Sequence, residues 1–187
     1  IQWLKDGLGI IKNVAEVAKL AAKVPDAGGV VFVPAMTGLG APHWRPDARG
    51  IVSGISRSTT SAHIARAVME GVALQQHDLV RAMEEDTGLK LRQLKVDGGA
   101  SENDLLMQFQ ADVLGIKLIR PKVVETTALG AAYLAGIQVG VWKKGDILKN
   151  RKIQKVFKPE MKEEVRSKLY AGWKKAVERT KNWVDNP

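Results

Sequence analysis

The stretch LKVDGGASEN, Leu94–Asn103, decides the fold, because it predicts a strand, a glycine turn and the start of a helix in succession. Ser101, with Asp104 three residues later, predicts a capping box at the start of that helix. Glycines permit positive φ and a close backbone approach, and a helix N-terminus offers unpaired N–H groups to an anion. The stretch is therefore a candidate nucleotide or phosphate site. A tight turn that merely needs glycine is the alternative.

Asn103 distinguishes this turn from a plain glycine turn. It lies four residues after Gly99 and is expected just inside the helix, where its amide offers a donor and an acceptor. Such a group suits the edge of a base or a ribose, whereas the alternative is a solvent-facing residue of the first helical turn. The pattern is neither a Walker loop, which needs Lys-Ser or Lys-Thr after its glycines, nor a dinucleotide fingerprint, which needs a third glycine.

A long amphipathic helix is predicted after a cap at Thr59, Thr60 or Ser61. Its apolar stripe has helical spacing and consists of Ile64, Val68, Gly71, Val72, Gln75, Leu79 and Met83. Gly71 has no side chain, and Gln75, four residues later, carries an amide on the same face. A flat ligand could therefore lie against Gly71. Local sequence alone favours the alternative, a helix-packing glycine with a glutamine at the edge of the core.

The rest of the chain alternates strands with helices, which predicts an α/β fold in one domain. Short runs bounded by turn formers predict strands at 30–33, 50–55 and 116–120. Helical spacing predicts amphipathic helices over 1–22, broken near Gly7 and Gly9, and over about 159–183. Thr126 or Thr127 is expected to cap a further helix made mostly of small residues.

Composition excludes several classes of protein. The 187 residues contain no cysteine, which removes disulfides and thiolate nucleophiles, and three scattered histidines predict no metal site. We find no run long enough to cross a bilayer and no leader, so we expect a soluble, cytoplasmic protein without a membrane partner. Nearly all of the net charge of +9 lies after residue 140, on a Lys/Glu-patterned helical face, which argues against nucleic acid as a partner.

The three histidines give no sign of acid–base chemistry. His43 lies in the loop Thr37–Gly50, which is dense in turn formers, and no carboxylate or serine lies at a recognisable spacing from it. We therefore expect a structural role for His43. His63 and His77 fall in the long helix and are expected to be surface or cap residues.

Several motifs resemble those of one enzyme family. Gly50–Ile55, followed after seven residues by His63–Glu70, is similar to the second signature of the FGGY carbohydrate kinases, which belong to the actin-like ATPase superfamily. The loop Pro34–Trp44, with Ala48–Gly50, resembles the loop that separates glycerol kinases from pentose kinases. Further similarity is carried by Val96–Ala100, Leu106–Asp112, Ala128–Gly136 and Tyr170–Trp173. The resemblance covers nearly the whole chain.

The resemblance implies a fold, a ligand and a site. Residues 1–187 would form part of the C-terminal nucleotide-binding domain of an FGGY kinase, an actin-like ATPase (ribonuclease H-like) domain without its first strands. ATP, with Mg²⁺, would be the cofactor. Gly98, Gly99 and Asn103 would contact the adenosine end of ATP, and Gly71 and Gln75 would line the same pocket. The small-residue helix around Gly130 would pack tightly beside the nucleotide turn.

The departures from the family pattern concern catalysis. The family's catalytic aspartate lies in a Gly-Asp-Gln-Gln stretch, which this chain does not contain, so no catalytic residue is assigned here. We expect the whole protein to phosphorylate glycerol to glycerol 3-phosphate with Mg-ATP. The alternative is a separate nucleotide-binding or oligomerisation module without kinase activity. Glycerol would bind through the part outside this chain, which alone should be inactive. The whole protein is expected to be a homo-oligomer. Gln76 and His77, where relatives often carry Thr or Ser, depart at the rim of the pocket.

Overall fold

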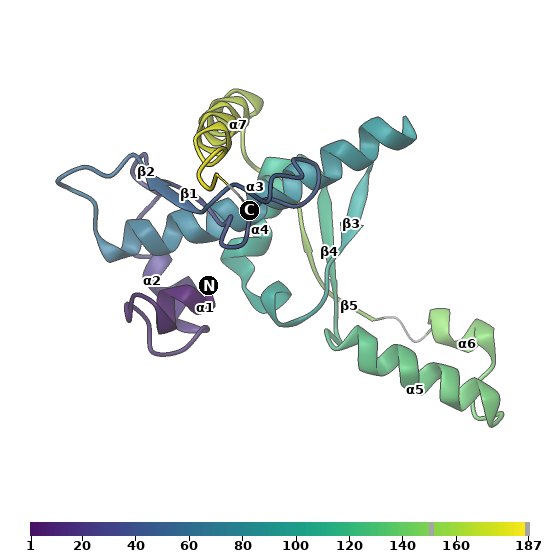
Figure 1. Cartoon of the computed structure of the whole chain (residues 1–187). Coiled ribbons are helices and arrows are strands. Elements are labelled where there is room, and N and C mark those ends of the chain that lie inside the picture. Colours follow the sequence, from purple (N-terminus) through teal and green to yellow (C-terminus); the bar gives the residue numbers. More distant parts are fainter. Residues whose placement is uncertain (150–151, 186–187) are drawn as a thin grey trace.

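A long helix, α3 (Ser61–Thr87), runs through the centre of the molecule and organises the other elements around it (Figure 1). The computed structural model describes residues 1–149 and 152–185. Before α3 come α1 (Gln2–Asp6), α2 (Glu16–Ala21), β1 (Val31–Val33) and β2 (Ile51–Ser53). After it come β3 (Gln93–Lys95), the short 3-10 helix η1 (Gly99–Glu102), α4 (Asp104–Leu114), β4 (Lys117–Pro121), α5 (Thr126–Gln138), α6 (Lys144–Lys149), β5 (Ile153–Phe157) and α7 (Glu163–Glu178).

Two small sheets flank the helices. β1 and β2 pair antiparallel, with Phe32 opposite Val52. The second sheet has the order β3-β4-β5, in which β3 and β4 are parallel and β5 is antiparallel to β4. The parallel pair is possible because α4 carries the chain back between the two strands. This strand–helix–strand unit confirms the predicted α/β class.

The ends of α3 follow from its sequence. Thr60 is the N-cap, and its backbone N–H donates to Nδ1 of His63 at 3.2 Å, in the manner of a capping box. Gly88 ends the helix in the left-handed conformation, with φ of 67°. Two expectations for this helix were wrong. Met83 is exposed, and His77 is 4% exposed because α7 packs over this side of α3 and places the Tyr170 ring 4.4 Å from the imidazole.

Gly71 marks the closest approach of α3 to the first sheet. A Cβ atom on Gly71 would lie 2.1 Å from the backbone oxygen of Phe32 in β1. Real Cβ atoms do not come so close to a carbonyl oxygen, so any larger residue would push the helix away from the strand. The missing side chain of Gly71 is therefore explained by packing.

One hydrophobic core joins most of the elements. Its largest fully buried side chains include Leu4 of α1, Met69 of α3, Leu106 of α4, Leu118 of β4 and Trp173 of α7. α5 lies outside this core, since Gly136 is its one buried residue.

The expectation that the small-residue helix packs tightly beside the nucleotide turn is therefore wrong. α5 runs away from the body of the molecule and leads into α6 (Figure 1). A Cβ on Gly130 would meet no atom within 4 Å. Among the helices in the described residues, none is long and apolar enough to cross a membrane.

Candidate nucleotide-binding turn

The turn after β3 is held by its own backbone. Gly98 has φ of 74° and ψ of 169°, a conformation that residues with a side chain rarely adopt. Its N–H donates to the backbone oxygen of Val124 at 2.9 Å, and its carbonyl accepts from the N–H of Ser101 at 3.0 Å and from Ser101 Oγ at 2.7 Å. A Cβ on Gly98 or Gly99 would meet no atom within 4 Å, so the outer face of the turn is open to a ligand.

The start of α4 differs from the expected capping box. Ser101 is buried in η1 and bonds back to Gly98, because the chain makes one 3-10 turn before the α-helix begins. Asn103 is the N-cap of α4, and its Oδ1 accepts from the backbone N–H of Leu106 at 3.1 Å. The expectation that Asn103 lies just inside the helix was therefore wrong, because the cap lies at Asn103 and not at Ser101.

The amide of Asn103 also reaches α3. Its Nδ2 lies 3.5 Å from Sδ of Met69, to which it donates. A carboxamide nitrogen carries two hydrogens and its oxygen has two lone pairs, so the cap and the Met69 contact leave capacity for a ligand. Asn103 thus has a structural role, as the N-cap of α4 and as a donor to Met69, beside any role toward a ligand.

Arg120 of β4 holds the turn in place through contacts of its side chain. This buried guanidinium donates from Nη1 to the backbone oxygen of Ser101 at 2.5 Å and from Nε to Gln154 at 2.7 Å, and its Nη2 pairs with Asp104 at 2.8 Å. The hydrogen bond from Lys155 and then that from Arg120 hold the pKa of Asp104 below its usual value. Thr126, the first residue of α5, donates its hydroxyl to Asp97. The turn is therefore fixed to both neighbouring strands and to the root of α5.

The structure does not bring all five predicted site residues together. Gly71 lines a groove of about 650 Å³, bounded by residues of β1, α3, α4 and α7 together with the segments beside them, and Gly98, Gly99, Asn103 and Gln75 do not line it. Met69, which contacts Asn103, precedes Gly71 by two residues and so points about 200° away around the helix. Gln75 is half-buried. That Gly71 and Gln75 share a pocket with the turn stays a prediction.

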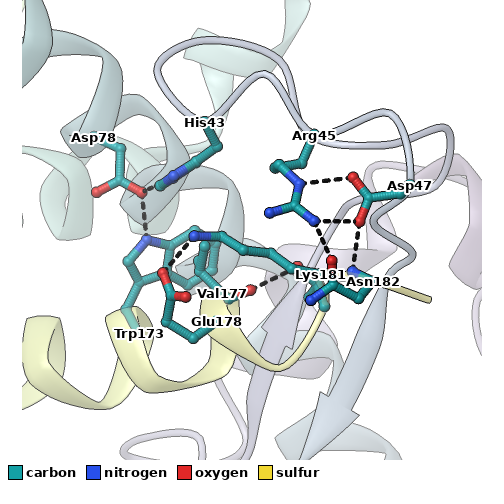
Figure 2. A network of polar contacts seen from close by, with 10 residues as sticks. His43, Arg45, Asp47, Asp78, Trp173, Val177, Glu178, Lys181 and Asn182 are labelled. Carbon is teal, nitrogen blue, oxygen red and sulfur yellow. Dashed lines mark hydrogen bonds and ion pairs between the residues drawn. The ribbon is translucent and has the colours of Figure 1, made fainter. Parts of the chain in front are cut away.

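A second polar cluster, the Asp78 node, was not found from the sequence. Asp78 is 5% exposed and accepts from Nε1 of Trp173 at 2.6 Å, while Nε2 of His43 lies 3.2 Å from the same oxygen (Figure 2). Burial would raise the pKa of Asp78, but the nearby imidazole of His77, 3.9 Å away, and the contacts from Trp173 and His43 hold the pKa below its usual value. The sequence feature that could have predicted this node is the position of Asp78 beside the apolar stripe of α3.

The node ties the loop Thr37–Gly50 to the body of the molecule, as the structural role predicted for His43 requires. Arg45 and Asp47 form a bidentate pair at 2.7 and 2.6 Å, and Asp47 also accepts from the backbone N–H of Asn182 at 2.5 Å (Figure 2). The loop is thus held by α3 on one side and by the C-terminal segment on the other. Trp44, between the two anchors, is 74% exposed.

No metal centre can be assigned within the described residues, because they contain no group of three or more His, Cys, Asp or Glu side chains placed to hold an ion. A Mg²⁺ ion for this fold family would therefore depend on the nucleotide phosphates and on groups outside the described part of the chain.

Comparison with known proteins gives a consistent result. The FGGY family of carbohydrate kinases, C-terminal domain, matches residues 1–139. A glycerol kinase of Oleidesulfovibrio alaskensis is 57% identical over 187 residues, and glycerol kinase 2 of Sulfolobus acidocaldarius is 56% identical over 185 residues, 98% of this chain. The first match covers 100% of this chain. The chain spans 38% and 37% of the lengths of these two relatives.

Solved structures agree with the sequence matches. Plasmodium falciparum glycerol kinase with ADP matches 96% of this chain with a TM-score of 0.86 at 39% identity, and the match covers 36% of that protein. A xylulose kinase from Rhodospirillum rubrum matches 88% of the chain, and 33% of its own, with a TM-score of 0.70 at 28% identity. The predicted actin-like fold class is thereby confirmed. Because the family match covers most of the chain and these relatives are more than half identical to it, the chain belongs to the FGGY family of carbohydrate kinases, in its C-terminal domain.

Proposed function

We propose that this chain is the ATP-binding part of a glycerol kinase, a longer protein that transfers the γ-phosphoryl group of ATP to glycerol and forms glycerol 3-phosphate. The observation that carries the proposal is the open Gly98–Gly99 turn, which stands on a strand–helix frame similar to that of a glycerol kinase solved with ADP. Relatives at 56 and 57% identity that are named glycerol kinases support the substrate.

Charge around the turn favours the adenosine end of ATP over its phosphates. Asp97 and Glu102 flank the two glycines in the sequence, whereas Asp104, at the first position of α4, is already paired with Arg120 and Lys155. A phosphate here would meet these carboxylates, although the helix N-terminus alone would attract it. Ribose hydroxyls can instead donate to carboxylates, and a base edge can pair with the amide of Asn103. The turn therefore suits the neutral half of the nucleotide.

Catalysis belongs to the rest of the longer protein in this proposal. Phosphoryl transfer depends on positioning and on charge stabilisation between nucleotide, metal ion and acceptor. The 187 residues contain no Gly-Asp-Gln-Gln stretch to supply the family's base. Mg²⁺ would accompany ATP and neutralise phosphate charge. The cysteine-free composition supports a cytoplasmic location, and the exposed Trp44 supports self-association of the longer protein.

Titration calorimetry with ATP, together with an assay for glycerol-dependent ADP release, tests the proposal on the purified chain. We expect ATP binding without turnover, and we expect turnover to appear when the rest of the protein is supplied. ADP release by the chain alone would contradict the proposal that catalysis needs the rest of the protein. Binding without any restored turnover would favour the alternative, a separate nucleotide-binding or oligomerisation module.

Asn103 gives a sharper test because a cap-preserving variant exists. Asn103→Ser keeps an N-cap oxygen for Leu106 but removes the amide, whereas Asn103→Ala removes both. We expect each variant to weaken ATP binding about tenfold, and Asn103→Ala to lose a further 1 kcal/mol or so of folding free energy. ATP affinity retained in Asn103→Ser would exclude Asn103 from the adenosine site.

A further inference from the structure

Two helix caps compete at the start of α4. Ser101 and Asp104 are spaced as the first and fourth residues of a capping box, which would start the helix at Ser101. The structure instead uses Asn103 as the N-cap, with the 3-10 turn η1 before it. Serine and asparagine cap helices about equally well, so side-chain preference does not select Asn103. The selection therefore needs a contact with another part of the chain.

Arg120 makes such a contact, because it binds both groups that the earlier cap would use. In a helix that began at Ser101, the carbonyl of Ser101 would accept from the N–H of Leu105, four residues later. That carbonyl instead accepts from Nη1 of Arg120 at 2.5 Å. The Asp104 carboxylate, which would reach back to the N–H of Ser101, instead pairs with Nη2 of Arg120 at 2.8 Å. Arg120 thus withdraws both halves of the competing cap.

The guanidinium of Arg120 is itself held in place. It is 6% exposed, its Nε donates to Gln154 of β5 at 2.7 Å, and it lies 5.2 Å from the centroid of the Phe157 ring. It cannot turn toward water without breaking these contacts. Lys155 also pairs with Asp104, at 2.6 Å, but its side chain is 47% exposed, and a solvated ammonium restrains a partner less than a buried planar fork does.

The cap that is used determines the shape of the nucleotide turn. With the cap at Asn103, the N–H and the hydroxyl of Ser101 both bond to the carbonyl of Gly98, at 3.0 and 2.7 Å. Asn103 has φ of −79° and ψ of 100°, which directs its amide to Leu106 and Met69. A helix that began at Ser101 would give Asn103 a helical backbone and would draw the serine hydroxyl away from Gly98. The turn would then lose its support and the amide would change direction.

We infer that Arg120 is a positioning residue for nucleotide binding, because it selects the cap of α4 and so sets the shape of the Gly98–Gly99 turn. The inference deepens the proposed function and rests on it, since it takes the turn as the site of ATP. Arg120 does not touch the nucleotide; it acts through the Ser101 carbonyl and the Asp104 carboxylate.

Hydrogen exchange at one amide of the longer protein tests the selection of the cap. The first α-helical bond of α4 runs from the N–H of Met107 to the carbonyl of Asn103, so the N–H of Leu105 precedes it. In Arg120→Met the helix should extend to Ser101, and the Leu105 amide should exchange about tenfold more slowly than in the parent. General loss of stability speeds exchange and cannot slow it. Unchanged or faster exchange of Leu105 would overturn the inference.

A matched arginine at the other end of α4 tests the effect on ATP. Arg166 donates from Nη1 to the carbonyl of Asp112 at 3.4 Å and pairs through Nη2 with Glu163, and its side chain is 19% exposed. We expect Arg120→Met to raise the Kd for ATP about 10- to 100-fold, and Arg166→Met to raise it less than about threefold. The KM for glycerol should stay the same in both. Equal losses of ATP affinity would show that both arginines merely support α4, and would overturn the inference.

A second substitution supplies a rescue that general damage does not allow. Asp104→Ala removes the acidic half of the competing cap, so it should restore ATP affinity at least about threefold when added to Arg120→Met. In the parent, where Arg120 still holds the Ser101 carbonyl, Asp104→Ala should change the affinity less than about twofold. Losses that add, without rescue, would contradict a competition between two caps.

These measurements separate the inference from the proposed function. Failure of the unsubstituted protein to bind ATP would refute the proposed function, and the Leu105 amide would still show whether Arg120 selects the cap. Full ATP affinity in Arg120→Met would refute the inference and leave the proposed function standing. If Arg120→Met does not fold, Arg120→Lys replaces it, because one ammonium cannot hold Ser101, Asp104 and Gln154 together. Leu105 should then exchange about threefold more slowly, and an unchanged rate would be the contrary result.

Discussion

The Asp78 node and the Gly98–Gly99 turn are both fixed by hydrogen bonds within the protein, yet one is closed and the other is open. At the node, the buried carboxylate of Asp78 is held by Trp173 of α7 and by His43 of the Thr37–Gly50 loop. At the turn, hydrogen bonds to Val124 and Ser101 fix the backbone, while the outward side of both glycines meets no neighbour. Polar groups satisfied by protein stabilise the fold, whereas a rigid backbone with an open side is prepared for a ligand.

The largest loss of stability should come from breaking the Asp78 node. Asp78→Ala leaves the indole N–H of Trp173 buried without its acceptor and removes the partner of His43, so we expect a loss of about 3 to 5 kcal/mol in the free energy of unfolding. Urea denaturation measures it, with the exposed Asp86→Ala on the same helix as control. A loss below about 1 kcal/mol would show that the node is not structural.

Gly71→Ala distinguishes a packing glycine from a ligand-facing one. The new methyl group would lie 2.1 Å from the carbonyl of Phe32, and we expect a loss of about 2 to 3 kcal/mol of stability. Gly172→Ala on α7 is the matched control, because a Cβ there meets no atom within 4 Å and should stabilise the helix by up to about 1 kcal/mol. Unchanged stability of Gly71→Ala with lost ATP binding would restore Gly71 to the nucleotide site.

Acid should lower the stability of the fold by protonating carboxylates that accept hydrogen bonds in it. The backbone N–H of Leu91 donates to Glu84 at 2.8 Å, and this bond is the main cause that lowers the pKa of Glu84 from 4.5 to about 2. A carboxyl group whose folded pKa is lowered stabilises the fold above its unfolded pKa, and that contribution is lost as pH falls toward the folded value. We expect the loss between pH 4.5 and about 2, amounting to about 1.5 kcal/mol.

Glu84→Gln provides the check on this window. The variant should be less stable than the parent chain near neutral pH and should lose less stability on acidification. Unfolding curves collected across the range would show it. If the variant and the parent lost the same stability on acidification, Glu84 would not be a source of the pH dependence.

The sequence anticipated the parts of the molecule that depend on neighbouring residues. The cap at Thr60, the glycine turn at Gly98 and the alternation of strands and helices all follow from local propensities, and the structure confirms them. The 3-10 turn that moves the helix cap from Ser101 to Asn103 depends on Arg120, which comes from a strand far along the chain. No local pattern encodes that contact.

Long-range packing decided the features that the sequence did not predict. The Asp78 node needs Trp173, which lies 95 positions later, and the burial of His77 needs Tyr170. The exposure of α5 was also missed, because its small residues look like those of a packed helix. For Gly71, spacing could suggest a ligand but the carbonyl of Phe32 explains the residue.

The central claim is that the open side of the Gly98–Gly99 turn holds the nucleotide, and one pair of variants tests it most directly. Gly98 and Gly88 have φ of 74° and 67°, and a Cβ on either meets no atom within 4 Å, so Gly98→Ala and Gly88→Ala impose similar backbone strain. Titration calorimetry of the longer protein with ATP should show at least a tenfold loss of affinity for Gly98→Ala and less than a twofold change for Gly88→Ala. Equal ATP affinities for the two variants would contradict the claim.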